Sequence, residues 1–98
     1  MAEADLLYLS AQQAAAMIRQ RKLSPVELTE AVLNQTERIQ PLNAFVTVLY
    51  DQARSAAHAA EAAVLRGDAP APLHGVPVHV KDQVDTAGIR TTFGSAIF

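Results

Sequence analysis

The chain has 98 residues, a formal net charge of −2, no cysteine and 50% hydrophobic residues, many of which are alanine. This composition predicts good helices around a thin core and excludes disulfide frameworks and thiolate zinc sites. The sequence shows no basic face, no apolar run of ~18 residues and no basic leader before its acidic start, MAEADLLYLS, so we expect no direct nucleic-acid contact, no membrane span and a cytoplasmic location.

Two helices are predicted in the first 41 residues. The first begins at Ser10, where Gln13 three residues later completes a capping-box pattern, and it ends before Ser24. Ser24 opens the second helix, with Glu27 as its expected capping-box partner, and Pro41 ends that helix. The short turn between the helices predicts an αα-hairpin. Its inward faces are expected at Ala14, Met17 and Ile18 in the first helix and at Leu28, Ala31, Val32, Gln35 and Ile39 in the second.

The pattern then changes to one that favours strands. Residues 44–50 read AFVTVLY and residues 76–80 read VPVHV, and both runs are apolar and β-branched, so each predicts a strand. Between them a third helix is expected to begin with Asp51 as its cap, to present a stripe of small residues, and to end at Gly67. The expected fold class is therefore α/β.

The densest chemistry lies in residues 73–95, LHGVPVHVKDQVDTAGIRTTFGS. Lys81 ends the second predicted strand and precedes a loop rich in glycine and threonine, and such strand ends are where α/β enzymes place reacting groups. A lysine can act as a general base where desolvation or neighbouring cations bring its pKa from about 10.4 towards 7 or 8. The alternative, from spacing alone, is that Lys81 pairs with Asp82 and points at water.

Histidines offer weaker candidates. His74, His79 and Asp82 include metal-ligand types, but positions 74 and 79 on a strand point to opposite faces, so one ion cannot easily meet both. His58 is expected at the solvent edge of the third helix. We therefore expect neither a metal nor a cofactor.

The stretch LHGVPVHVKD followed by TAGIRTTFGS resembles the amidase-signature family, whose members carry [LI]-x-G-[IV]-P-x-x-[VI]-K-D and then a loop like T-x-G-x-x-T-[ST]-x-[GA]-S. The SPVEL and NAF segments and the alanine-rich helix agree with it, so the resemblance covers about Tyr8 to Phe98. It implies that residues 1–98 are the N-terminal segment of a single amidase domain: a helical hairpin, then strand–helix–strand of a mixed central sheet, incomplete on its own.

The resemblance further implies a Ser–cis-Ser–Lys triad. One serine attacks the amide carbonyl, the second relays the proton, and a neutral lysine is the base. Lys81 matches this lysine, whereas the serines belong to a Gly/Ser-rich segment that this sequence does not contain, so we expect the chain alone to be inactive. A supporting loop is expected from Asp82, Gln83, Thr91, Thr92, Gly94 and Ser95.

Details of this loop are also open to prediction. Gln83 stands where relatives often have asparagine, which is one methylene shorter. Asp82 is expected to pair with a backbone amide or with Arg90, and Thr91 and Thr92 to satisfy backbone groups of the loop.

Three functions are compatible with these observations. The first is a serine-type amidase acting on a small-molecule carboxamide. The second is the A subunit of a glutamyl-tRNA amidotransferase, in which a different subunit would hold the tRNA. The third is a non-enzymatic helical interaction module that uses the face of Leu28, Val32 and Ile39. In a full-length protein we expect a homodimer or amidotransferase subunits as partners.

Overall fold

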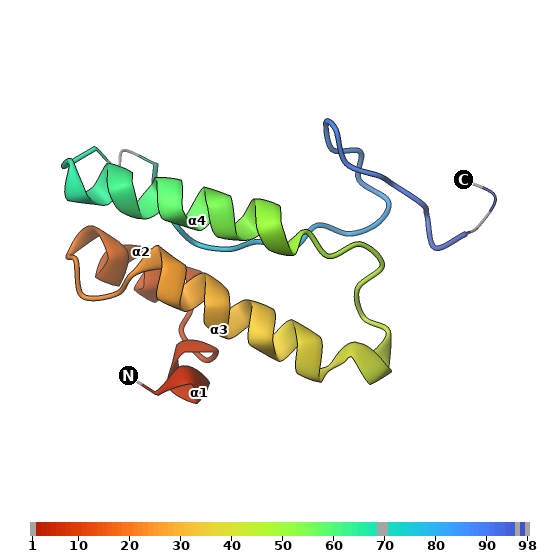
Figure 1. Cartoon of the computed structure of the whole chain (residues 1–98), viewed down its shortest axis with the longest axis horizontal. Coiled ribbons are helices and arrows are strands. Elements are labelled where there is room, and N and C mark those ends of the chain that lie inside the picture. The colour runs from red at the N-terminus through yellow and green to blue at the C-terminus, as the bar shows by residue number, and fades with distance from the viewer. Residues whose placement is uncertain (1, 69–70, 96, 98) are drawn as a thin grey trace.

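Helices, with one isolated bridge between Thr86 and Ile89, make up all the regular structure in residues 2–68, 71–95 and 97, which the computed structural model of the chain describes. Figure 1 shows α3 and α4 as a long antiparallel pair, with the shorter helices packed at one end. The elements are α1 (Glu3–Leu6), α2 (Ala11–Arg19), α3 (Pro25–Arg38), the 3₁₀ turn η1 (Gln40–Leu42) and α4 (Tyr50–Leu65).

Serine caps begin α2 and α3, as predicted. The Gln13 amide donates to Ser10 Oγ at 3.0 Å and the Ser10 amide donates back to Gln13 Oε1 at 2.9 Å, which completes the capping box. Ser24 Oγ accepts from two first-turn amides of α3, at 3.1 and 3.3 Å. The predicted partner Glu27 is exposed, and the Ser24 hydroxyl instead donates to Glu61 of α4 at 2.7 Å. This cap therefore also ties the start of α3 to α4.

The core lies where α2, α3 and the end of α4 meet. Ile18 and Pro25 are its two largest completely buried side chains. Leu28 and Ala31 are buried as predicted, and Val32 packs against them half-buried. Burial of each large aliphatic side chain contributes roughly 1.5–3 kcal/mol, so this small cluster is the main source of stability. Its buried members are Leu6, Ala14, Ile18, Leu23, Leu28, Ala31 and Val64.

The short helix α1 was not expected from the sequence. Its Leu6 is buried against the core, and its Glu3 carboxylate accepts hydrogen bonds from Arg38 at 2.5 Å and from Asn34 at 3.3 Å. These two bonds, the one to Arg38 being the stronger, lower the pKa of Glu3 below its ordinary value. The N-terminal residues are thus attached to α3 by one apolar and one charged contact.

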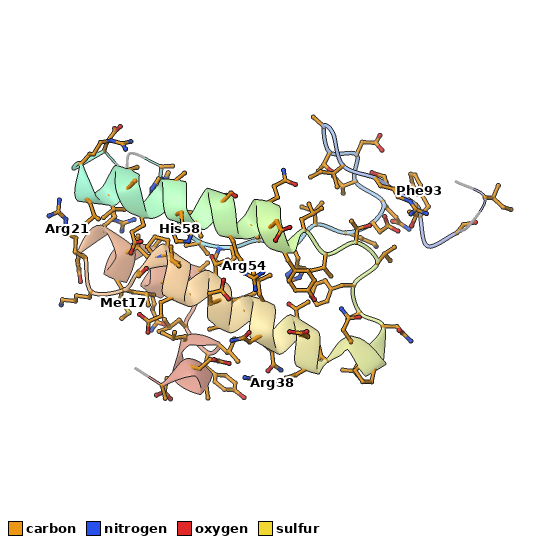
Figure 2. The ribbon with its side chains drawn as sticks, viewed as in Figure 1. Met17, Arg21, Arg38, Arg54, His58 and Phe93 are labelled. Atoms are coloured by element: carbon orange, nitrogen blue, oxygen red, sulfur yellow. The ribbon has the colours of Figure 1, made fainter. Side chains whose placement is uncertain are left out.

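Two sets of hydrogen bonds cap the C-terminal end of α4. Gly67 follows the helix with a φ of +78°, its amide donates to Val64, and the Asp68 amide donates to Ala63. This pair of bonds is a Schellman motif, which satisfies carbonyls that a helix end leaves open. Arg21, at the same end of the molecule in Figure 2, donates to two of the last carbonyls at 3.1 and 3.4 Å. The predicted glycine stop at Gly67 is confirmed.

The predicted α/β class is wrong for the described part of the chain. Segments 44–50 and 76–80 form no strand, and so the strand–helix–strand of a mixed sheet is absent there. The two segments do meet, since the rings of Phe45 and His79 pack edge to face with centroids 5.7 Å apart. A strand requires a neighbour that pairs its N–H and C=O groups, and neither segment has one. Three of their valines stay exposed, at 60%, 85% and 52%: Val46, Val78 and Val80.

The start of α4 also differs from its prediction. The helix begins at Tyr50, with Leu49 at the N-cap position and no side-chain cap, so Asp51 lies in the first turn instead of capping it. Arg54 reaches from α4 to α3 (Figure 2), where its Nε donates to Glu30 at 2.6 Å. This hydrogen bond lowers the pKa of Glu30 and raises that of Arg54. An ion pair thus joins α3 and α4 beyond the reach of the apolar core.

The molecule is elongated, with extents of 45 × 28 × 21 Å and a radius of gyration of 14.5 Å. A compact domain of this length has a radius of gyration of about 13 Å. Figure 1 shows the reason: the chain after α4 runs back along the helix pair and then continues past the start of α4. Among the described helices, none is both long enough and apolar enough to cross a membrane.

The returning segment is anchored to the helices by polar contacts. Arg19 of α2 donates to the Pro72 carbonyl at 3.1 Å, and His74 Nε2 lies 3.0 Å from the Ala60 carbonyl of α4. Val76 packs against the buried core. The residues that lead to Lys81 therefore begin from a fixed position on the helical layer.

Gly75 makes the closest of these approaches. Its φ is +83°, and a Cβ added there would lie 3.0 Å from Pro25 Cγ and 3.3 Å from Ile18 Cδ1. Both neighbours are completely buried, so neither can move aside cheaply. A glycine is required both by the left-handed backbone and by the lack of space.

We expect Gly75→Ala to destabilise the chain by about 2–3 kcal/mol, because left-handed strain adds to overpacking. Gly67→Ala is the matched control, since Gly67 has a similar φ of +78° but open space around it; strain alone should cost about 1 kcal/mol there. Denaturant unfolding followed by circular dichroism measures both. Equal losses for the two variants would contradict the packing role of Gly75.

Candidate active site

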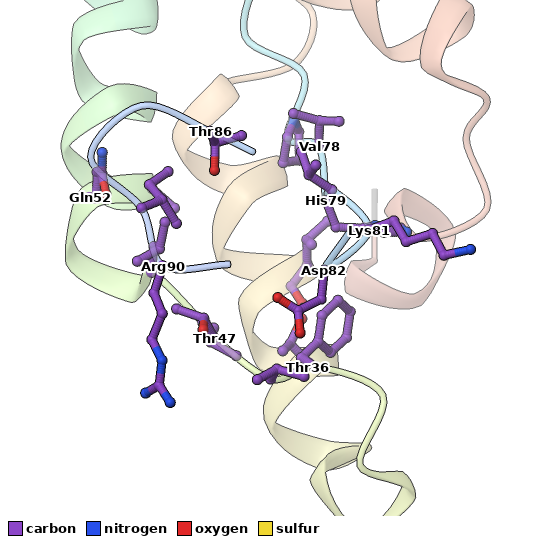
Figure 3. Close-up of a pocket in the computed structure, with 18 of the residues that line it drawn as sticks. Thr36, Thr47, Gln52, Val78, His79, Lys81, Asp82, Thr86 and Arg90 are labelled. Atoms are coloured by element: carbon purple, nitrogen blue, oxygen red, sulfur yellow. The ribbon is translucent and has the colours of Figure 1, made fainter. Parts of the chain in front are cut away.

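An open cavity of about 700 Å³ lies beside the predicted catalytic segment. Its walls come from α3, the start of α4, residues 44–49 and parts of residues 77–91, and they are mainly apolar (Figure 3). The polar groups on the wall include Thr36, Thr47, Gln52, Thr86 and Arg90. A concave, largely apolar site with a few polar groups is the usual setting for small-molecule binding.

Lys81 stands on the rim of this cavity. The residue contributes to the wall, but it is exposed, and Figure 3 shows its side chain extending away from Asp82 and the other labelled residues. Among the described residues its ammonium group has no ion-pair partner. The interpretation in which Lys81 pairs with Asp82 is therefore wrong, although the lysine does point outward as that interpretation expected.

Asp82 is bound instead by the residues of the loop. Its Oδ1 accepts from the Thr92 amide at 2.8 Å, and its Oδ2 accepts from the Gly94 amide at 3.0 Å and from the Thr92 hydroxyl. The Asp82 main-chain carbonyl accepts from the Phe93 amide at 3.0 Å. Three consecutive amides thus donate to one residue, and we call this arrangement the Asp82 clamp.

The clamp explains the electrostatics of Asp82. The hydrogen bond from the Thr92 hydroxyl, followed by those from the Thr92 and Gly94 amides, holds the pKa of Asp82 below its ordinary value. Arg90 contributes only weakly, through the attraction of its charge. The prediction that Asp82 pairs with a backbone amide is confirmed, and the alternative partner Arg90 is secondary.

The remaining loop residues fall into two groups. Thr91, Thr92, Gly94 and Ser95 lie with Asp82: Thr91 Oγ1 donates to the Val84 carbonyl at 3.4 Å, and the Ser95 amide donates to Thr92 at 3.0 Å. Thr91 therefore satisfies a backbone group of the loop, as predicted. Gln83 is exposed and takes no part in the clamp.

The histidines have structural contacts. His74 meets the Ala60 carbonyl, His79 packs on Phe45, and His58 is exposed at the edge of α4 as predicted. Across the portion of the chain with described coordinates, no group of three or more His, Cys, Asp or Glu side chains is arranged to hold a metal ion.

The sequence interpretation missed part of the cavity wall. Thr29 and Thr36 of α3 are buried and face the cavity. They lie seven residues apart, so they share a helix face with the apolar Leu33. This spacing of four and three residues is the signal in the sequence that places both threonines on one helix face.

The protein-family model described as Amidase matches residues 27–98, which include Lys81 and the whole Asp82 clamp. The chain belongs to the amidase family. An amidase from Pseudomonas putida is 46% identical over 92 residues, which cover 93% of this chain and 20% of that protein. The A subunit of glutamyl-tRNA(Gln) amidotransferase from Carboxydothermus hydrogenoformans is 39% identical over 94 residues, or 95% of this chain and 19% of the relative.

The protein of the same name from Dehalococcoides mccartyi is 42% identical over 92 residues, or 93% of this chain and 19% of the relative. This amidase-family chain thus spans about a fifth of the length of the curated relatives that it matches. No solved structure matches it significantly.

The clamp should open in acid. Because hydrogen bonding lowers the folded pKa of Asp82, its stabilising contribution is fully present above the unfolded value of about 3.9 and is lost as the pH falls through the folded value. Amide hydrogen-exchange protection of Thr92 and Gly94, measured by NMR from about pH 6 to about pH 2, should disappear at the acid end.

Two variants control this titration. Asp82→Ala should leave the Thr92 amide unprotected at every pH, because the side-chain oxygen that accepts from it is gone. Asp85→Asn removes an exposed carboxylate from the same loop and should titrate like the unaltered chain. Protection that survives to the lowest pH would contradict a role for the Asp82 charge.

Proposed function

We propose that this chain is the lysine-bearing segment of an amidase that acts on carbon–nitrogen bonds of carboxamides, with Lys81 as the proton acceptor. The observation that carries the proposal is that Lys81 lies at the rim of a cavity and that its neighbour Asp82 holds the TTFGS loop, 10 to 14 residues after Lys81, through the Asp82 clamp. Membership of the amidase family supports the same chemistry.

The proposed chemistry requires more than this chain contains. A serine hydroxyl is a weak nucleophile and needs an adjacent base, and a lysine can be that base only where its surroundings hold it neutral. Lys81 is exposed in this structure, so its desolvation would have to come from further parts of an amidase. We accordingly propose that residues 1–98 are one segment of a single amidase domain, and that the two serines implied by the resemblance lie outside it.

A second candidate is the A subunit of a glutamyl-tRNA amidotransferase. It is favoured by the relatives that carry this name, at 39% and 42% identity, against 46% for the named amidase. In this alternative the partners would be further amidotransferase subunits, whereas a small-molecule amide and a homodimer fit the first candidate.

The helical interaction module is not favoured. Leu28, one of its three proposed contact residues, is buried within the chain's own core, and Val32 packs against that core. Two of the three residues of that face are therefore engaged within the chain itself. The cytoplasmic location stays a prediction.

Amide hydrolysis should depend on Lys81 once the chain is part of a complete enzyme. We expect a chimera in which residues 1–98 replace the corresponding segment of the Pseudomonas putida amidase to release ammonia from simple carboxamides. Lys81→Met should lower kcat by at least about a thousandfold, because removing one member of a catalytic unit removes most of its effect.

The chain offers a matched control, because its second lysine, Lys22, is also exposed. Lys22→Met makes the same change in charge and size and should leave kcat as it is. A Lys81→Met chimera that hydrolyses amides at the unaltered rate would overturn the proposal. The separate 98-residue chain should release no ammonia, and turnover by that chain would contradict the requirement for further residues.

A further inference from the structure

We infer that Asp82 is a positioning residue for Lys81: by binding residues 92–94, it fixes the main chain from which the lysine projects. The inference rests on the proposed function, in which Lys81 accepts the proton. It differs from a charge effect, in which the carboxylate would act on the ammonium group directly.

The first step in the argument is the number of donors committed to Asp82. The carboxylate binds the Thr92 amide, the Thr92 hydroxyl and the Gly94 amide, while the Asp82 carbonyl binds the Phe93 amide. Thr92 is only 3% exposed, so water competes poorly for its hydroxyl. Asp82 therefore binds each of the three consecutive residues 92–94 that form this short turn.

The second step is the backbone conformation that these bonds maintain. Phe93 has a φ of +54° and Gly94 has a φ of +69°. A phenylalanine in the left-handed region is strained and persists only where its surroundings hold it there. Successive amides in such a turn form a concave nest for an anion, and here the chain supplies the anion itself, as the Asp82 carboxylate.

The third step concerns the main chain just before Asp82, which makes few hydrogen bonds of its own. From residue 78 to residue 81, no main-chain N–H donates to any residue that the structure describes. Upstream of Lys81, the main chain is attached to the helical core at Gly75 and Val76, and the His79 ring packs edge to face on Phe45. Lys81 and Asp82 share a peptide unit, and the Lys81 carbonyl accepts from the Val84 amide at 3.0 Å. The main-chain hydrogen bonds next to Lys81 thus all lie on its downstream side, at Lys81 and Asp82 themselves.

The fourth step separates position from charge. The lysine side chain extends away from Asp82 in Figure 3, and the carboxylate oxygens are already bound to loop donors. A carboxylate engaged in this way acts on its neighbour mainly through the backbone. Neutralising Asp82 should therefore misplace the lysine without changing the pH at which the lysine works.

The test uses the full-length chimera with Asp82→Asn and, separately, Thr92→Val. We expect kcat to fall about ten- to a hundredfold in both, because small misplacements of a catalytic group cost this much, while KM changes less than about twofold. The apparent pKa values of the kcat profile against pH should not move. Asp82→Glu should not restore the rate, because its extra methylene displaces the carboxylate.

Thr92→Val keeps the Asp82 charge and removes one donor, so it also tests the inference if Asp82→Asn folds poorly. Asp85→Asn, an exposed change on the same loop, should leave kcat and the profile as they are. Unchanged kcat in Thr92→Val, or a lower kcat accompanied by a shifted pH profile, would overturn the positioning role. Activity in the Lys81→Met chimera would instead overturn the proposed function, so the two failures are distinguishable.

Discussion

The contact between Gly75 and the buried pair Ile18 and Pro25 is the constraint on which the arrangement of this chain depends. It joins the turn between α2 and α3 to the segment that returns from α4, and it admits no side chain at position 75. The contacts of Pro72 with Arg19 and of His74 with Ala60 hold the same segment to α2 and to α4. The segment that leads to Lys81 starts from this junction.

After this junction, hydrogen bonds replace apolar packing as the main contacts of the chain. Helices α2, α3 and α4 are held by a small core of aliphatic side chains and by capped ends. Beyond residue 77 the described chain has no helix and little burial, and the Asp82 clamp provides its most extensive set of contacts. The hydrogen bonds to the Asp82 carboxylate therefore hold the loop together, whereas an aliphatic core holds the helices together.

Local signals allowed the helical part of the fold to be predicted. Ser10, Ser24 and Gly67 cap helix ends through residues within a few positions of themselves, so their capping roles follow from spacing alone. Strands depend on a partner that lies elsewhere, and the β-branched runs at 44–50 and 76–80 were given a structure that no neighbour provides. A β-branched composition favours an extended chain but does not supply the neighbouring strand that its N–H and C=O groups need.

In the candidate site, too, features set by nearby residues were predictable and features that depend on distant contacts were not. The motif around Lys81 was sufficient to identify the family and to select Asp82 and Thr92, but it left the partner of Asp82 open between an amide and Arg90. The left-handed conformation of Phe93 could not be predicted, because it is held by a contact with Asp82, eleven residues away. Thr29 and Thr36 were missed because their burial is decided by packing and not by residue type.

The approach of Gly75 to Pro25 also bears on how relatives of this chain can be recombined. SPVEL and HGVP read as separate motifs, yet the proline of one touches the glycine of the other, so they form a single structural unit. A gene crossover between residues 25 and 75 would combine Pro25 from one relative with Gly75 from another. A crossover after residue 76 would take both residues from the same relative. Shuffled libraries of such enzymes should therefore tolerate exchange on the lysine side of this boundary better than within it.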